Sequence, residues 1–275
     1  MQFDNAPAPL TLRTNTLRLS SDALVDRLDK DDIRVHPGRY SPDAFIVDEG
    51  HPLRGEGVER GWFVVQDEAS QLVAQLAHAR PGMRVLDACA SPGGKTTAMA
   101  AAMRGQGCIV ACDVRDRRVQ LLRRTVSASG ATNVAIVQAD LLRALPFCRP
   151  FDLVVVDAPC SGLGTLRRDP DIRWRRLETD LTALAAGELT MLQHAADAVA
   201  PGGRLVYSTC SSEPEENEAV VRAFLAGASG FVHIDAHAAS PSLPPAVIDD
   251  RGCLRTQPHL HGLEAFFGAV FARPA

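Results

Sequence analysis

The feature that most constrains the fold is a series of short, almost wholly apolar segments that alternate with stretches of helical periodicity. Residues 83–89, 108–113, 134–140 and 151–159 are typical of strands, and a fifth such segment at residues 203–209 follows a helical stretch over about residues 179–200. Apolar strands separated by helices indicate a parallel sheet covered on both faces. We therefore predict an α/β fold built on a mostly parallel, doubly wound, Rossmann-like sheet.

A polar or reactive residue stands at the carboxyl end of each predicted strand. These residues are Asp87, Asp113, Asp140, Asp157 and Cys210. Ligands of open α/β sheets bind outside the carboxyl ends of the strands, so we expect these side chains to face a shared site. For any single aspartate, a helix cap is an equally good interpretation.

A turn-rich stretch at residues 35–61 separates this region from a smaller N-terminal part. Within that part, L-T-L-R-T-N-T-L is typical of a strand and S-S-D-A-L-V-D-R-L of a short capped helix. We predict a small α+β subdomain over residues 1–57 and a larger domain over residues 58–275, whose first helix covers about residues 66–79.

The composition limits the class of protein. With 275 residues, 46% of them hydrophobic, the chain can bury a full core. No apolar run is long enough to cross a bilayer, and the first residues do not resemble a signal peptide. We expect a cytoplasmic monomer without membrane contact.

The seven cysteines are odd in number and form no C-x-x-C pair, so neither a disulfide framework nor a metal site is expected. Four of them are interpreted as small buried apolar residues, namely Cys108, Cys112, Cys148 and Cys253. Cys89, Cys160 and Cys210 lie beside predicted strand ends and need separate treatment.

Arginine is concentrated in two segments, at residues 115–124 and 166–176, although the formal net charge is −4. Both segments are candidate phosphate contacts, with Arg167, Arg168 and Arg173 the candidates in the second. A solvated helix face is an equal alternative for the first segment and a weaker one for the second, which also carries Trp174.

The first predicted strand leads into the loop D-A-C-A-S-P-G-G-K-T. Gly93 and Gly94 allow the backbone to approach a ligand closely before a helix that Lys95 opens. The loop is neither the phosphate loop nor the G-x-G-x-x-G dinucleotide turn. Asp113 is placed to accept hydrogen bonds from a ribose diol, and Asp140 to meet an adenine. The pattern predicts a ligand that contains a nucleoside.

Two cysteines follow the fourth and fifth strands, in D-A-P-C-S-G and S-T-C-S-S. A single cysteine at a strand end is more often buried filler. The pair Cys160 and Cys210 beside Asp157, however, suits methylation of cytosine at carbon 5, which becomes nucleophilic after a thiolate adds to carbon 6. That reaction also needs a proton donor near ring nitrogen 3 and a base for the carbon-5 proton.

On these residues the chain resembles the Sun/RsmB family of RNA cytosine-5 methyltransferases. The resemblance runs through P-L-T-L-R-T-N-T, Q-D-E-A-S-Q, D-A-C-A-S-P-G-G-K-T, D-A-P-C-S-G-L-G-T-L-R-R-D-P-D-I-R-W, S-T-C-S-S-E-P-E-E-N-E and H-G-L-E-A-F-F. Long motifs in the right order across nearly the whole chain are far more specific than one short pattern.

The resemblance implies a Rossmann-like class I methyltransferase that uses S-adenosylmethionine. It places the ribose at Asp113, the adenine edge at Asp140, and Arg118 close to the cofactor. It places the methionine part of the cofactor along the loop made by Cys89, Ala90, Ser91, Pro92, Gly93, Gly94 and Lys95.

The resemblance also assigns the catalytic roles. Cys210 would attack the base, Cys160 would help to break the adduct, and Asp157 would contact the target base beside the cofactor, with Lys95 in the same catalytic group. The small N-terminal subdomain would contact RNA, ribosomal RNA first and transfer RNA second; the sequence does not indicate which cytosine is modified.

The chain departs from the family pattern at a few places. A family member that modifies small-subunit ribosomal RNA has an additional helical RNA-binding domain, so we expect this chain to be a truncated or minimal form or to recognise RNA differently. Ser91 replaces the usual alanine, and Glu264 and Ala265 replace the usual D-G; we expect both changes to be tolerated.

Two other functional classes stay open. A methyltransferase acting on a small molecule or a protein would also need the cofactor loop, but not the paired cysteines or the arginine-rich segment. A non-catalytic RNA-binding or ribosome-assembly factor with the same fold would need neither Cys210 nor Lys95.

Overall fold

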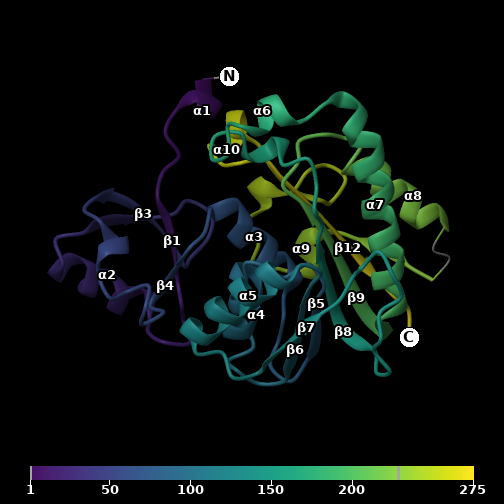
Figure 1. Ribbon diagram of the computed structural model, residues 1–275, viewed down its shortest axis with the longest axis horizontal. Helices are drawn as coiled ribbons and strands as arrows, with labels where there is room; N and C mark the ends of the chain where they lie inside the picture. The colour runs from purple at the N-terminus through teal and green to yellow at the C-terminus, as the bar shows by residue number, and fades with distance from the viewer. Residues whose placement is uncertain (1, 228–229) are drawn as a thin grey trace.

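A computed structural model describes residues 2–227 and 230–275 and contains two β-sheets flanked by helices (Figure 1). The larger sheet has eight strands in the order β10-β12-β9-β8-β5-β6-β7, with β11 paired to β12. Its strands are β5 (Arg84–Asp87), β6 (Cys108–Asp113), β7 (Val134–Gln138), β8 (Phe151–Asp157), β9 (Val199–Thr209), β10 (Val232–Ile234), β11 (Leu254–Thr256) and β12 (Phe266–Ala272).

The pairing from β9 through β8, β5 and β6 to β7 is parallel, as predicted. β12 pairs antiparallel with β9, and β10 and β11 pair antiparallel with β12. The predicted α/β fold with a mostly parallel sheet is therefore confirmed, and the last three strands add an antiparallel edge to it.

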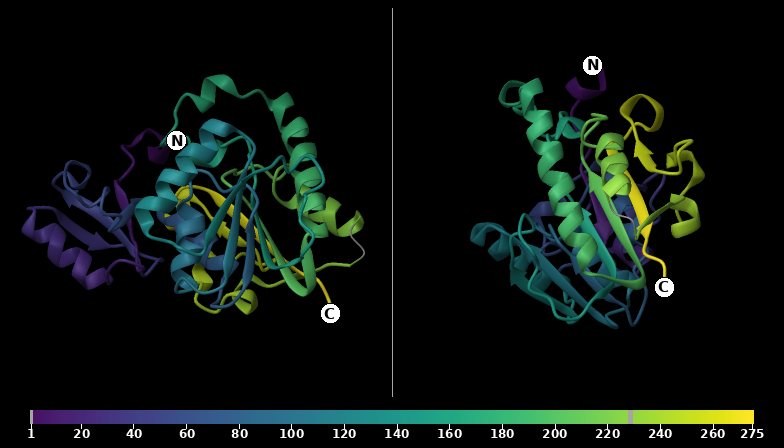
Figure 2. Two further views of the ribbon diagram at one scale, coloured as in Figure 1. Left: turned by 60° about the horizontal axis from the view of Figure 1, so that its bottom comes forward. Right: turned by 90° about the vertical axis from the view of Figure 1, so that its right-hand side faces the viewer.

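Helices cover both faces of this sheet (Figure 2). The helices that pack on it are α3 (Glu68–Ala77), α4 (Gly94–Ala102), α5 (Asp116–Ser129), α7 (Glu178–Asp197), α8 (Glu218–Gly227) and α9 (Ala236–Ala239). The connections between elements also hold the short helices α6 (Ile172–Arg175) and α10 (Pro258–His261) and the 3-10 turns η1 (Pro52–Arg54), η2 (Leu163–Thr165) and η3 (Pro245–Val247).

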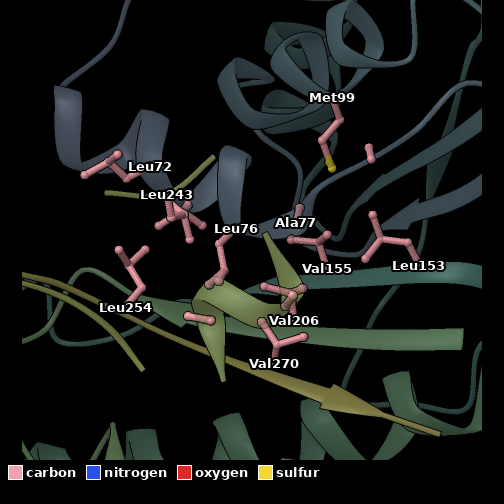
Figure 3. Packing of buried hydrophobic residues seen from close by; sticks show 14 of the residues in the cluster. Leu72, Leu76, Ala77, Met99, Leu153, Val155, Val206, Leu243, Leu254 and Val270 are labelled. Atoms are coloured by element: carbon pink, nitrogen blue, oxygen red, sulfur yellow. The ribbon is translucent and has the colours of Figure 1, made fainter. Parts of the chain in front are cut away.

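Alternate side chains of β8 point to opposite faces of the sheet, and both faces are covered. This explains why the strand is apolar almost without interruption. Leu153 and Val155 pack with residues of α3, α4 and α9 (Figure 3). Val154 and Val156 pack with residues of α7 and α8. The carboxyl ends of the central strands thus lie between two layers of helices.

The smaller sheet is antiparallel, in the order β2-β3-β1-β4. The predicted N-terminal strand and capped helix are confirmed, since Ser20 accepts a hydrogen bond from the backbone N–H of Ala23 at the start of α2. This part of the chain comprises α1 (Gln2–Asn5), β1 (Thr11–Thr14), α2 (Ser21–Lys30), β2 (Arg34–Pro37), β3 (Ala44–Glu49) and β4 (Phe63–Val65).

The division into residues 1–57 and 58–275 stays a prediction. β4, which pairs with β1, lies beyond residue 57, so the small sheet draws its last strand from the segment after the predicted boundary. The two parts are therefore joined by backbone pairing as well as by the connecting loop.

Buried polar contacts hold the two parts together. Arg13 of β1 donates to the side chains of Gln66 and Thr97 and to the carbonyl oxygen of Gly94 at the start of α4. Burial lowers the pKa of Arg13 to about 10, which still leaves it charged at neutral pH. The N-terminal sheet thereby fixes the loop that follows β5.

One prediction about the cysteines is wrong. Cys148 is exposed, because it lies in the irregular connection between β7 and β8, and Cys108, the first residue of β6, is only partly buried. Cys112 and Cys253 are buried, as predicted. In the part of the chain that the structure describes, no helix is long and apolar enough to cross a membrane.

The packing of α3 on β12 yields a stability prediction. Leu76 is fully buried, and a Cβ at Gly268 would lie 2.6 Å from its Cδ2 atom. Leu76→Ala should lower the free energy of unfolding by roughly 2–5 kcal/mol. Gly268→Ala should also destabilise by itself, yet should add almost nothing in the Leu76→Ala background, where the obstructing atom is gone.

Urea denaturation of the four proteins in this cycle measures the coupling. Leu53→Ala is the control, because Leu53 is exposed and its removal should change stability by less than about 0.5 kcal/mol. Additive losses for Leu76→Ala and Gly268→Ala would contradict the predicted contact.

Candidate active site

A pocket of about 410 Å³ lies at the carboxyl ends of β5 and β8, beside the segment that leads from β4 into α3. It brings together most residues of the predicted cofactor loop with two predicted catalytic residues, namely Cys89, Ala90, Ser91, Pro92, Gly94, Lys95 and Asp157. The rest of its lining is Val64, Val65, Gln66, Asp67, Ser70, Asp87, Thr125, Thr165, Arg168, Glu264 and Phe266. The other predicted cofactor and catalytic residues lie outside this lining, namely Gly93, Asp113, Arg118, Asp140, Cys160 and Cys210.

The glycines of the loop are required by their surroundings. Gly93 has a φ of 107°, and a Cβ there would lie 3.0 Å from Leu122 and 3.2 Å from Thr125 of α5. A Cβ on Gly94 would lie 3.3 Å from the side chain of Gln66. A side chain at Gly93 would therefore be strained by the backbone and crowded by α5. The close approach of this loop to a ligand stays a prediction.

Asp87 provides an unpartnered acceptor in the pocket. Its side chain is buried, and Oδ2 accepts a 2.6 Å hydrogen bond from Thr96, whereas Oδ1 has no hydrogen-bond partner among the described residues. Burial raises the pKa of Asp87 to about 6. A buried acceptor without a partner is costly, so this oxygen fits a ligand that brings an N–H or ammonium donor.

Asp113 and Arg118 form one unit at the end of β6. Arg118 Nε lies 3.1 Å from Asp113 Oδ2, and Arg118 Nη2 donates to the carbonyl oxygen of Ser91 at 2.7 Å. The Ser91 hydroxyl donates in turn to the carbonyl oxygen of Arg118 at 3.0 Å. The hydroxyl at position 91, a departure from the family pattern, therefore joins α5 to the loop.

Asp140 has a more local role in the structure. It accepts a hydrogen bond from the backbone N–H of Leu142 at 3.0 Å and lies 3.6 Å from Arg143. These contacts are those of a turn cap, the alternative interpretation of a strand-end aspartate. The cofactor role of Asp140 stays a prediction.

Lys95 and Asp157 make an ion pair at the centre of the site. Lys95 Nζ lies 2.7 Å from Asp157 Oδ2, and the Ser208 hydroxyl donates to Asp157 Oδ1 at 2.8 Å. Burial lowers the pKa of Lys95, but the attraction and hydrogen bond of Asp157 outweigh it and raise the pKa. The ammonium group, 5.6 Å from the centre of the Phe266 ring, is thus held as a fixed positive charge.

Cys160 and Cys210 come from neighbouring loops, and their sulfur atoms lie 3.3 Å apart. The hydrogen bond from Cys160 lowers the pKa of Cys210, with a further contribution from the charge of Lys95. The same hydrogen bond, together with burial, raises the pKa of Cys160, and burial raises that of Cys89. Of these three cysteines, Cys210 is the one whose surroundings favour the thiolate.

A buried carboxylate that our sequence reasoning missed joins the two cysteine loops. Glu216 accepts hydrogen bonds from the backbone N–H of Ser161 at 2.6 Å and from the hydroxyls of Ser161 and Ser211 at 2.5 Å. These serines directly follow Cys160 and Cys210. The available signal is the acidic run E-P-E-E-N-E after the second cysteine, because a run of that kind before a helix can turn one carboxylate inward.

The sequence also did not predict an ion-pair cluster of Arg168, Asp67 and Glu264 in the wall of the pocket. Arg168 pairs with Asp67 at 2.8 Å and with Glu264 at 3.4 Å. Glu264 is buried, which together with the charge of Asp67 raises its pKa to about 7. Arg168 therefore pairs with carboxylates of its own chain, which gives Glu264 a defined partner, and its contact with phosphate stays a prediction.

The neighbouring arginines hold the N-terminal segment. Arg167 donates to the carbonyl oxygens of Ala6 and Pro7, and Arg173 donates to Asn5. Their contact with phosphate stays a prediction. Among residues 2–227 and 230–275, no group of three or more histidine, cysteine or acidic side chains is arranged to hold a metal ion.

Comparison with known proteins identifies the family. The family model for 16S rRNA methyltransferase RsmB/F matches residues 74–272, and the ferredoxin-like domain of RsmF/B-like methyltransferases matches residues 1–54. The chain is 37% identical to ribosomal RNA small subunit methyltransferase B of Pseudomonas putida, over 84% of its own length and 54% of the relative's.

Other relatives agree. The chain is 35% identical to ribosomal RNA small subunit methyltransferase F of Serratia proteamaculans, over 96% of its length and 56% of the relative's. It thus spans about half the length of these curated relatives. A methyltransferase homolog protein from Pyrococcus horikoshii superposes with a TM-score of 0.84 at 28% identity, covering 99% of this chain and 88% of that one.

The resemblance seen in the motifs is therefore confirmed by matches that cover nearly all of the chain, and the structure agrees with it in fold. The chain belongs to the RsmB/F family of 16S rRNA methyltransferases.

Proposed function

We propose that the chain transfers a methyl group from S-adenosylmethionine to carbon 5 of a cytosine in ribosomal RNA, through a covalent adduct of Cys210. The observation that carries the proposal is the pair of sulfur atoms 3.3 Å apart, with the Cys210 thiolate favoured and the Lys95–Asp157 pair beside it. The relatives whose names describe methylation of small-subunit ribosomal RNA support the substrate class.

The residues around the pocket fit the cofactor. The unpartnered oxygen of Asp87 would accept a hydrogen bond from the amino group of the methionine part, and the loop from Cys89 to Gly94 would enclose that part. Asp113, oriented by Arg118, would hold the ribose diol, and Asp140 the adenine edge. When bound, S-adenosylmethionine supplies an electrophilic methyl group.

Cys210 would begin the reaction. Its thiolate adds to carbon 6 of the cytosine, which makes carbon 5 an enamine-like nucleophile that takes the methyl group. Asp157, held by Lys95 and Ser208, would contact the polar edge of the base and keep carbon 6 within reach of the sulfur. A base then removes the carbon-5 proton, and the bond between sulfur and carbon 6 breaks.

Cys160 would assist this last step. Its raised pKa keeps it a thiol, and its S–H group donates to the Cys210 sulfur. A hydrogen bond to sulfur stabilises the thiolate whether it is the nucleophile or the leaving group. We expect loss of that donor to slow the release of the adduct, the step that the family resemblance assigns to Cys160.

The first prediction for this site concerns pH. The rate at which iodoacetamide alkylates a thiol follows the thiolate fraction, so Cys210 should reach its maximum rate at lower pH than free N-acetylcysteine does. Cys160→Ala removes the main cause of the lowered pKa and should move the midpoint for Cys210 upward. Mass spectrometry of the Cys210 peptide measures both rates, and an unchanged midpoint in Cys160→Ala would contradict the assigned hydrogen bond.

The second prediction concerns the carboxylate that joins the loops. Glu216→Gln replaces an acceptor oxygen by an amide that cannot accept all three donors, which should cost about 1–3 kcal/mol and lower kcat while leaving KM for RNA nearly unchanged. Glu215→Gln is the matched control, because Glu215 is exposed beside it. A Glu216→Gln enzyme with the parent kcat would show that the hydrogen bonds of Glu216 to the two loops do not position the cysteines.

The third prediction tests the function itself. The parent, incubated with labelled cofactor and small-subunit ribosomal RNA, should yield labelled 5-methylcytidine in nucleoside mass spectrometry. Cys210→Ala should be inactive and form no covalent complex, whereas Cys160→Ala should accumulate protein joined to RNA, visible as a slow band on a denaturing gel.

The two variants are each other's control. A slow band from Cys210→Ala and none from Cys160→Ala would reverse the assigned roles. Labelling of a nucleoside other than cytidine, or of no RNA at all, would contradict the proposed function.

A further inference from the structure

The segment between the Cys160 loop and α7 carries the two most exposed large apolar side chains of the described residues. Trp174 is 87% exposed, and Leu177, three positions later, is 66% exposed. Trp174 lies in α6, at the upper edge of the molecule in Figure 1. An indole left in water offers a large, rigid contact surface that the fold itself does not use.

This exposed pair is fixed against the active-site loop. A Cβ at Gly162 would lie 2.9 Å from the side chain of Ile172, so Ile172 packs directly on the loop. On the other side of Trp174, Arg176 donates to the carbonyl oxygens of Ser161 at 3.0 Å and Cys160 at 3.4 Å. Trp174 is thus held between two anchors on the loop that carries Cys160.

The segment is also rich in arginine. Five arginines and two aspartates fall within residues 166–177, in a chain of formal net charge −4. Arg168 pairs with Asp67 and Glu264, and Arg175 pairs with Asp171. The hydrogen bonds of Arg176 go to carbonyl oxygens, which carry no formal charge and do not neutralise the guanidinium group. An exposed aromatic side chain among arginines is the combination with which proteins bind single-stranded nucleic acid.

We propose that Trp174 is a stacking platform for an unpaired RNA base that neighbours the target cytosine. The inference rests on the proposed RNA substrate. A base that enters a pocket leaves its stack, and the neighbouring base loses a partner. Trp174 replaces that partner within the same segment that Arg176 ties to the catalytic loop.

Tryptophan fluorescence tests this directly, because the chain has only two tryptophans, Trp62 and Trp174. In Trp62→Phe, the remaining Trp174 should be quenched when a short single-stranded oligocytidylate is added. In Trp174→Phe, the remaining Trp62, which lies under Arg27 in the N-terminal part, should not respond. The same strand hybridised to its complement should give no quenching, since its bases are already stacked.

Affinity provides the second readout. Trp174→Ala should weaken binding of the labelled oligocytidylate by roughly 5- to 100-fold in fluorescence anisotropy, whereas Trp174→Phe, which keeps a ring, should stay within about 3-fold of the parent. The dissociation constant of the cofactor should not change in either variant, which shows that the protein remains folded.

The outcomes separate this inference from the proposed function. Unquenched Trp174 in a protein that binds the oligocytidylate, or parent-like affinity of Trp174→Ala, overturns the stacking platform while Cys210-dependent methylation stands. A parent that neither binds the oligocytidylate nor methylates ribosomal RNA overturns both.

Discussion

The register between β8 and β9 places Asp157 opposite Ser208 and brings both strands to an end at the same edge of the sheet. Because the strands are parallel, the loops that leave them run side by side. Cys160 lies three residues beyond Asp157 and Cys210 two residues beyond Ser208, so the pairing that builds the core also sets the two sulfurs 3.3 Å apart. The site depends on this register, since a slip of one residue in either strand would turn that strand's own residue, Asp157 or Ser208, to the other face.

Much of this arrangement can be predicted from the sequence because it is periodic or local. The apolar runs predict the parallel strands, and a polar residue after each run predicts the edge at which a ligand binds. The glycine pair after the first strand predicts a turn, and Gly93 has the positive φ that such a turn needs. The roles of Cys160 and Cys210 required the family resemblance, because either cysteine could attack on spacing alone.

The remaining parts of the site could not be predicted, because they depend on contacts between distant segments. Nothing near Arg168 in the sequence shows that it meets Glu264 and Asp67, and nothing near Arg13 shows that it reaches the carbonyl oxygen of Gly94. The arginine-rich segment illustrates the same limit, because its composition indicates phosphate binding, whereas Arg168 pairs with Asp67 and Glu264 of the same chain. Exposure is equally non-local, as the mistaken burial of Cys148 shows.

The roles that we propose for the two cysteines agree with the charges that flank them. The sulfurs of Cys160 and Cys210, 3.3 Å apart in a partly buried site, share one hydrogen bond. The sulfur with the more positive surroundings is the one that loses its proton more easily. The hydrogen bond from Cys160 and the cation of Lys95 lower the pKa of Cys210, whereas the carboxylate of Glu216 adds to the rise at Cys160. Glu216 therefore has two effects: its hydrogen bonds fix the geometry of both loops, and its charge favours the protonated form of Cys160. A nucleophile in the loop after β9 and a proton donor in the loop after β8 are the assignment that this asymmetry favours.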